Sequence, residues 1–337
     1  MPFLASGRND NYAIVLAMRI YVLALNDVFD TGLSTLLDTF STANELAESA
    51  GTSSARFDVT VIGVRPRVRT SHGLSVPVRP AMRLARPDVV LVPALGAKMP
   101  EPLRSVLQRR DIIDAQALLR RWSGGGTLAG AACTGTFVLA GTSLLDGQRA
   151  TTSWWLAPFF RERYPHVVLD ESHMLVGSSR FVTAGAALAH LDLALWLVRR
   201  RSPALAALTA RYLVVDPRPS QAAFAIPDHL AHSDPLVERF ERWARRQLAD
   251  GFSLSEAARA ALTSERTLAR RLQSVLGKSP LAFFQDLRVE RAVHLLQTTS
   301  ASVDQIADQV GYADGVTLRT LIRRKLGRGV RELRVRG

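Results

Sequence analysis

Short apolar runs alternate with amphipathic stretches over residues 19–213. The apolar runs have the length and composition of buried strands, and the longer stretches between them repeat apolar residues at helical spacing. The predicted strands cover 20–25, 57–64, 87–93 and 127–132. The predicted helices cover 33–49, 102–122, 133–145, 188–201 and 204–213. This alternation predicts an α/β domain with a parallel sheet covered on both faces.

The pattern changes after a proline-rich break, Asp216-Pro217-Arg218-Pro219-Ser220. Beyond it every periodic segment is helical, so residues 233–337 are predicted to form an all-α domain. We therefore divide the chain into a leader at 1–18, an α/β domain at 19–213, a linker at 214–232 and the helical domain.

The helical domain contains two similar units. In the first, Ser253 and Glu256 have the spacing of a capping box at a helix start, and a second helix runs from Ser264 to a glycine cap at Gly277. Its leucines recur at i, i+4 and i+8 and predict a core face. Arg266 and Arg270 share a different face, as a recognition helix in the major groove requires.

The second unit repeats this plan. Ser302 and Gln305 form another expected capping box, and Gly311 ends the helix that follows them. A second candidate recognition helix spans 315–325, and one longer helix, 280–297, connects the units.

These segments resemble the DNA-binding domain of the AraC/XylS family, through Gly277-Lys278-Ser279-Pro280, residues 287–292, Ile306-Ala307 and Gly311-Tyr312. The resemblance implies seven helices, with two recognition helices entering successive major-groove faces about 34 Å apart. The DNA-contacting residues that it implies are Glu265, Arg266, Arg270, Thr317, Arg319, Thr320, Arg323 and Arg324.

The two units differ at the positions that match base-reading residues. The first has Arg266 and Arg270 there, whereas the second has Gly315, Val316 and Thr320. Glycine and valine cannot make bidentate hydrogen bonds to a base. We therefore expect the first unit to supply most of the sequence specificity and the second to hold phosphates. The alternative is that the arginines are solvated side chains on a plain helical bundle.

The single cysteine, Cys133, lies between a predicted strand and a helix in Gly130-Ala131-Ala132-Cys133-Thr134-Gly135. Small neighbours and a following helix are typical of a nucleophile elbow, where the helix N-terminus lowers the thiol pKa. The alternative is an unreactive thiol buried in the core.

The α/β domain resembles the ThiJ/PfpI superfamily, and more closely the amidotransferase-like sensor domains fused to AraC-type regulators. The residues that carry the resemblance are Cys133-Thr134-Gly135, residues 144–147, 150–154, 183–185 and 191–195. It implies a flavodoxin-like α/β sandwich that usually dimerises.

Two departures from the catalytic relatives indicate that no catalytic residue is present. Ser153 stands where they have a histidine, and Gly32 stands where they have an acid, although Asp30 is close by. The other histidines, at 72, 166, 173 and 190, are expected at the surface or in supporting roles. The elbow is therefore interpreted as a former active site reused as a ligand pocket.

That pocket is expected at the carboxyl ends of the strands. Its expected lining is Asn26, Leu95, Gly96, Cys133, Thr134, Ser153 and Trp154. Trp154 and Trp155 could stack on a cationic ligand, but they fit equally well in a core or a dimer interface.

Composition narrows the class of protein. The 337 residues are 47% hydrophobic and carry a net charge of +13, more than half of it beyond residue 230, which favours a polyanionic partner. One cysteine excludes an internal disulfide and suits a reducing compartment, and no apolar run reaches the roughly 20 residues of a membrane span.

The sequence thus predicts a cytoplasmic, homodimeric transcription regulator that binds double-stranded DNA and a small effector, cationic or amino-acid-like, without a metal or cofactor. Two alternatives remain open. One is a redox sensor acting through Cys133, and the other is a cysteine-dependent amidase, peptidase or glyoxalase-like enzyme with a DNA-binding appendage.

Overall fold

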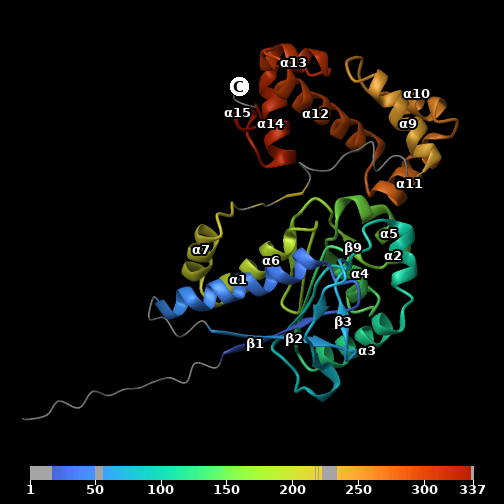
Figure 1. Cartoon of the computed structure of the whole chain (residues 1–337). Helices are drawn as coiled ribbons and strands as arrows, with labels where there is room; N and C mark the ends of the chain where they lie inside the picture. The colour runs from blue at the N-terminus through green and yellow to red at the C-terminus, as the bar shows by residue number, and fades with distance from the viewer. Residues whose placement is uncertain (1–16, 50–55, 217, 219, 222–233, 335–337) are drawn as a thin grey trace, which may run out of the picture.

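A computed structural model describes residues 17–49, 56–216, 218, 220–221 and 234–334 (Figure 1). The α/β part is built on a seven-stranded sheet in the order β10-β11-β7-β6-β1-β2-β5. These strands are β1 (Met18–Leu23), β2 (Phe57–Gly63), β5 (Arg79–Pro80), β6 (Val89–Val92), β7 (Leu128–Ala132), β10 (Leu175–Gly177) and β11 (Phe181–Ala184). All neighbours are parallel except β10 and β11. Short pairs, β3 (Val68–Arg69) with β4 (Ser75–Val76) and β8 (Arg149–Ala150) with β9 (Val168–Leu169), lie outside the main sheet.

Helices cover both faces of the sheet, as the sequence predicted. They are α1 (Asp30–Ser49), α2 (Pro100–Val106), α3 (Arg110–Gly124), α4 (Gly135–Ala140), α5 (Ala157–Arg163), α6 (Ala189–Arg201) and α7 (Pro203–Tyr212). The apolar residues of α1, α6 and α7 form one core against the sheet, and those of α2 to α5 form a second core on the opposite face. The central strand β6 is buried at every position because it is packed on both sides.

The single helix predicted over 102–122 is wrong, because the chain forms α2 and α3 with a break between them. Arg109, which precedes α3, has an extended backbone (ψ 147°). Its guanidinium bonds Asp111 and the carbonyl oxygen of Asn26, so a tertiary contact fixes the break. The helix predicted to reach Leu145 ends at Ala140.

The observed strands also differ from the predicted ones. The first strand begins at Met18, inside the predicted leader, whose first 16 residues lie outside the described part of the chain. Strand β11 was not predicted, because a run of four residues, three of them apolar, is too short a signal on its own. Its side chains are all buried, which shows that packing between β10 and β7 defines it.

The residues described beyond the linker form seven helices, as the family resemblance implied. They are α9 (Pro235–Arg246), α10 (Leu254–Ala260), α11 (Glu265–Leu276), α12 (Pro280–Thr298), α13 (Val303–Gln309), α14 (Gly315–Leu326) and α15 (Val330–Leu333). The helices divide into two packed units that share α12, each with its own hydrophobic core. Most of the linker predicted at 214–232 lies outside the described residues.

Most of the helix caps predicted for the C-terminal part are present in the structure. Gly277 (φ 66°) ends α11 and Gly327 (φ 69°) ends α14, both in the left-handed conformation that favours glycine. Ser302 and Gln305 form the expected capping box. At Ser253 only half of the expected box is present: the hydroxyl accepts the amide hydrogen bond of Glu256, and the reverse bond is not formed.

No helix among the described residues combines the length and the apolar character needed to span a bilayer. Within the same residues, no three acidic, histidine or cysteine side chains are grouped as metal ligands.

Candidate DNA-binding surface and elbow site

The first recognition helix, α11, has the two faces that its sequence predicted. Leu268 and Leu272 are fully buried, and Leu276 is nearly so, in the core of the first unit. Arg266 and Arg270 are exposed on another face, next to the exposed Glu265. The Ser264 hydroxyl caps the helix by accepting the amide hydrogen bond of Thr267. Both arginines are therefore held on a rigid helix with their guanidinium groups free to reach base edges.

The second recognition helix, α14, has a different outer face. Gly315 is buried, and its amide donates to the carboxylate of Asp304 at 2.9 Å. A Cβ on Gly315 would lie 2.6 Å from that carboxylate, so glycine is required for α14 to pack on α13. Val316 is 66% exposed, so it can offer only apolar contact to a base.

The other predicted contact residues of α14 fall into two groups: threonines whose hydroxyl groups bond within the protein, and exposed arginines. The Thr317 hydroxyl donates to Asp314, and the Thr320 hydroxyl donates to the Val316 carbonyl oxygen. Arg319, Arg323 and Arg324 are exposed. The outer face of α14 thus presents three exposed cations.

Cys133 occupies a sharp turn between β7 and α4, with a positive φ of 53°. The Ser153 hydroxyl donates to its Sγ at 2.8 Å, and the Thr152 hydroxyl donates to its carbonyl oxygen. The side chain is only 4% exposed. Burial raises the pKa of the Cys133 thiol, although hydrogen bonds from Ser153 and Thr134 oppose the rise. The expectation of a lowered pKa is wrong, because desolvation outweighs the single short helix that follows.

The space that an acid at position 32 would occupy is filled by His190. This histidine is fully buried, not at the surface, and its ring lies 2.6 Å from where a Cβ on Gly32 would be. Its Nε2 accepts the amide hydrogen bond of Ala94, and its Nδ1 faces the carbonyl oxygen of Ala187 at 2.7 Å. Both ring nitrogens are therefore engaged by the backbone, and burial lowers the pKa of His190 to about 4.

Asp30, the other candidate for the acid, begins α1 and accepts hydrogen bonds from the Ser71 hydroxyl and the His72 amide. Only its Oδ2 is engaged by the loop between β3 and β4, and its Oδ1 is buried without a hydrogen-bond partner.

We predict that Gly32→Glu will not create a cysteine hydrolase. The new side chain must displace the His190 ring, so the variant should lose about 1–3 kcal/mol of stability, as overpacked cores do. Its amidase, esterase and glyoxalase activities should stay at the level of wild type. Turnover that depends on Cys133, measured against the Gly32→Glu/Cys133→Ala double variant, would overturn this prediction.

The residues expected to line the elbow pocket are partly brought together. The Thr134 hydroxyl bonds both the amide and the carbonyl oxygen of Leu95, and Ser153 contacts Cys133. Thr134, Ser153 and Leu95 are all at least 98% buried. In this conformation the elbow is therefore packed, and a ligand there would have to displace side chains.

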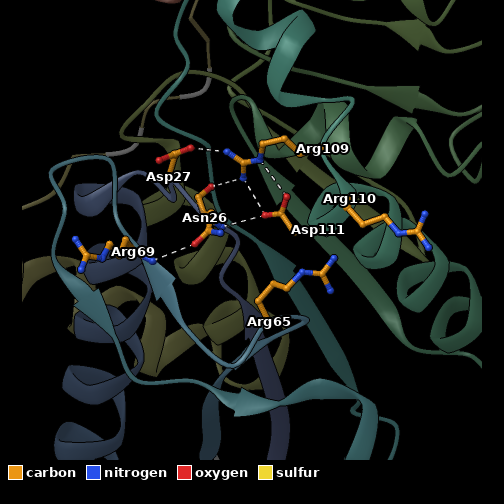
Figure 2. A pocket seen from close by; sticks show the side chains of 7 residues that line it. All are labelled: Asn26, Asp27, Arg65, Arg69, Arg109, Arg110 and Asp111. Carbon is orange, nitrogen blue, oxygen red and sulfur yellow. Dashed lines mark hydrogen bonds and ion pairs between the residues drawn. The ribbon is translucent and has the colours of Figure 1, made fainter.

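Asn26 lies elsewhere, in an open cavity of about 510 Å³ at the end of β1 (Figure 2). The cavity is lined by Asn26, Asp27, Arg65, Arg69, Arg109, Arg110 and Asp111. Arg109 is bound on two sides, by both carboxylate oxygens of the buried Asp111 and by Asp27. Gly96 adjoins this region, because its amide donates to the Asp27 carbonyl oxygen. The Arg109 network was not predicted, since its members are far apart in sequence.

Trp154 lines neither the packed elbow nor the Asn26 cavity. It packs against the core of the first helical unit, with its ring 5.7 Å from that of Trp155. This agrees with the alternative interpretation of the tryptophans as packing residues.

Gln221 is a site residue that sequence reasoning missed. It follows the proline-rich break, yet its side chain is fully buried beside the elbow. Its amide nitrogen donates to the carbonyl oxygen of Thr152 at 2.8 Å, and its amide oxygen accepts from the Trp154 backbone. A polar residue in a predicted linker gives no signal for such burial.

Two family models match the chain. Residues 18–200 match the DJ-1/PfpI family, and residues 257–336 match a helix-turn-helix domain.

Individual relatives are named as transcription regulators. The HTH-type transcriptional regulator ArgR of Pseudomonas aeruginosa is 30% identical over 201 residues, which cover 58% of this chain and 61% of ArgR. The HTH-type transcriptional regulator GlxA of Rhizobium meliloti is 27% identical over 60% of this chain and 64% of its own length. The alignments thus span less than two thirds of either relative. A crystal structure of an AraC family transcriptional regulator from Pseudomonas putida covers 58% of this chain and 98% of its own, at 20% identity and a TM-score of 0.49.

Proposed function

Because this chain belongs to the DJ-1/PfpI family and matches a helix-turn-helix domain at its C-terminal end, we propose that it is a DNA-binding transcription regulator. In this proposal residues 19–213 form a sensor and dimerisation domain that responds to a small molecule, and residues 233–337 form a bipartite DNA-binding domain.

The observation that carries the proposal is the outer face of α11. Two arginines four residues apart are exposed there, while leucines on the opposite face anchor the helix in its core. Arginine makes the commonest specific contact to a base, a bidentate pair of hydrogen bonds to guanine.

Direct contacts connect the elbow to the DNA-binding domain, which supports a sensory role. Ser153 bonds Cys133, and the next residue, Trp154, packs on the first helical unit. Helix α5 lies against α11 (Figure 1). There the Arg161 guanidinium pairs with Glu171 and donates to the Val275 carbonyl oxygen of α11 at 3.5 Å. A ligand that repacks the elbow would therefore move a segment on which the recognition helix rests.

The protein is proposed to act without catalysis. The elbow thiol is buried with a raised pKa, and Ser153 occupies the place of the base. If turnover of any amide, ester or glyoxal substrate were found and lost in Cys133→Ala, the enzymatic alternative would replace this one. Burial of Cys133 also argues against a peroxide sensor. Peroxide titration of DNA affinity in wild type and Cys133→Ser tests that alternative directly.

The effector is proposed to bind at the carboxyl end of β1, in the Asn26 cavity rather than in the packed elbow. Arg109 and Asp27 of this cavity already pair with each other. An amino-acid-like molecule would exchange that pair for its own carboxylate against Arg109 and its own ammonium group against Asp27.

The proposed function is tested by selecting duplexes from a random 40-base-pair pool with the full chain, and by mapping bound DNA across the genome. Enrichment of one motif, recovered at the mapped sites, is the expected result. Failure to enrich any sequence would refute specific DNA binding. The genes beside the mapped sites would supply candidate effectors.

The bonds of Gln221 give a prediction about the connection between elbow and linker. In Gln221→Ala, buried backbone groups of Thr152 and Trp154 lose their partner, at about 1–3 kcal/mol for each unsatisfied group. We expect the free energy of unfolding of the α/β part to fall by about 2 kcal/mol in urea titrations. The control is Gln108→Ala, which is exposed and should change stability by less than about 0.5 kcal/mol. Equal effects in the two variants would show that Gln221 does not secure the segment.

A further inference from the structure

A second cavity lies on the DNA-binding domain, between α14, α15 and the start of α13. Its volume is about 580 Å³. Four of its lining residues are arginines and one is acidic: Arg319, Arg323, Arg331, Arg334 and Glu332. We call it the arginine cavity. Neither family resemblance nor sequence pattern assigned a role to α15.

The charge of this cavity is not balanced by the protein. Among the described residues, none of its four guanidinium groups lies within 4 Å of a carboxylate, and the Glu332 carboxylate accepts the amide hydrogen bond of Gly329. The Arg334 Nε is buried without a hydrogen-bond partner, although its Nη2 donates to the Ala301 carbonyl oxygen. The Asn26 cavity differs, because there Arg109 and Arg65 are paired with aspartates. Four cations that face one space with a single acid favour an anion in that space.

The cavity is fixed in place by packing. Leu333 of α15 is 6% exposed and belongs to the core of the second unit, together with Leu318 and Ile322 of α14. Arg331 therefore lies on a helix that is anchored against α14, and Arg334 is the residue that caps the C-terminal end of that helix.

The cavity also lies beside the outer face of α14. At 100° per residue, Val316 and Thr320 point in nearly the same direction, Arg323 lies close to them, and Arg319 lies further round the helix. The major groove is about 12 Å wide, and a helix with its side chains is about as wide. When Val316 and Thr320 face the bases, the side carrying Arg319 must face one wall of the groove, which is a row of phosphates.

We propose that the arginine cavity is a phosphate clamp, in which Arg331 of α15 and Arg334, the C-cap residue of that helix, join Arg319 and Arg323 of α14 to hold one backbone phosphate group of bound DNA. This inference rests on the proposed function and adds α15 to the DNA-binding surface. The clamp holds α14 in its groove without reading bases, which agrees with the absence of base-discriminating side chains at Gly315 and Val316.

The test compares Arg331→Gln/Arg334→Gln with wild type on two 40-base-pair duplexes, one selected from the random pool and one with the same bases in scrambled order. The variant should bind both duplexes more weakly, by a similar factor. The slope of log K against log salt should become shallower by about 0.9 for each phosphate that the variant no longer neutralises. When the salt concentration is raised from 50 to 200 mM, both proteins lose DNA affinity. The factor lost by the variant should be about threefold smaller than the factor lost by wild type, for each such phosphate.

Two further variants keep the result interpretable. Arg242→Gln removes an exposed arginine of α9 that does not line the cavity and pairs with Glu238, so it should leave the salt slope unchanged. Arg331→Gln alone retains the Arg334 bond to Ala301, so it should stay folded by circular dichroism and still show the shallower slope.

Each other outcome contradicts the clamp. An unchanged slope in a folded Arg331→Gln variant overturns it, and so does a loss confined to the selected duplex, which would indicate base reading. Thermal stabilisation of wild type by pyrophosphate, with no change of slope in the variants, would assign the cavity to a small free anion instead. If wild type binds neither duplex, the proposed function itself fails, whereas binding by wild type with an unchanged slope in the variants removes only the clamp.

Discussion

Replacing both Arg266 and Arg270 by alanine should abolish most of the preference of this protein for its selected duplex. Each arginine is exposed on the face of α11 opposite its buried leucines. A base-reading arginine contributes about 1–3 kcal/mol, so the double variant should lose roughly 2–6 kcal/mol on the selected duplex, if the two act independently. Affinity for scrambled DNA should fall much less. Fluorescence anisotropy with both duplexes measures the two quantities.

The matched control for this prediction is Arg242→Ala. Arg242 lies on α9 and is paired with Glu238, one turn away. Its removal should leave both affinities within about twofold of wild type, since exposed pairs contribute little. If the double variant retained its preference for the selected duplex, α11 would not be the base-reading helix.

Acidification from pH 7 to pH 5 should weaken the fold through His190. The pKa of His190 is about 4 in the folded chain, against an ordinary value of 6.5, because burial disfavours the charged ring. A depressed histidine pKa means that the unfolded chain binds more protons between these values, so stability falls as the pH drops below 6.5. This pKa shift corresponds to a total decrease of roughly 3 kcal/mol in the free energy of unfolding, of which about 2 kcal/mol is lost by pH 5.

Urea titrations at pH 7 and pH 5 check this effect, with His190→Gln as the control. The glutamine oxygen can accept the Ala94 amide hydrogen bond but does not titrate, so the pH dependence between 7 and 5 should largely disappear. Despite desolvation, hydrogen bonds lower the pKa values of Asp30 and Asp170, so these carboxylates reduce stability only below about pH 4. The same slope in both proteins would show that His190 is accessible to protons in the folded state.

Local sequence signals were sufficient for the DNA-binding domain. Helices α9 to α14 begin at serine or aspartate caps, and α11 and α14 end at left-handed glycines. Each of these devices acts within a few residues. The spacing of Leu268, Leu272 and Leu276 fixed which face of α11 is buried. Arg266 and Arg270 could therefore be placed on the outer face without knowledge of the rest of the fold.

The elbow shows where local signals fail. The positive φ of Cys133 follows from its small neighbours, but the direction of its pKa shift depends on how much of the protein covers the thiol. From the sequence, His190 was expected either at the surface or in a supporting role. Only the packing of α6 against α1 brings its ring into the space beside Gly32.

The sequence by itself determined the two-part architecture, the parallel sheet with helices on both faces, the all-α character of the C-terminal part and the orientation of α11. These features depend on periodicity and capping, which are encoded within one or two turns of chain. Only the tertiary structure decided the break before α3, the burial of Gln221 beside the elbow, the separation of Asn26 from Cys133 and the grouping of α14 and α15 arginines. Each of those depends on residues that are far apart in sequence and meet only when the cores have formed.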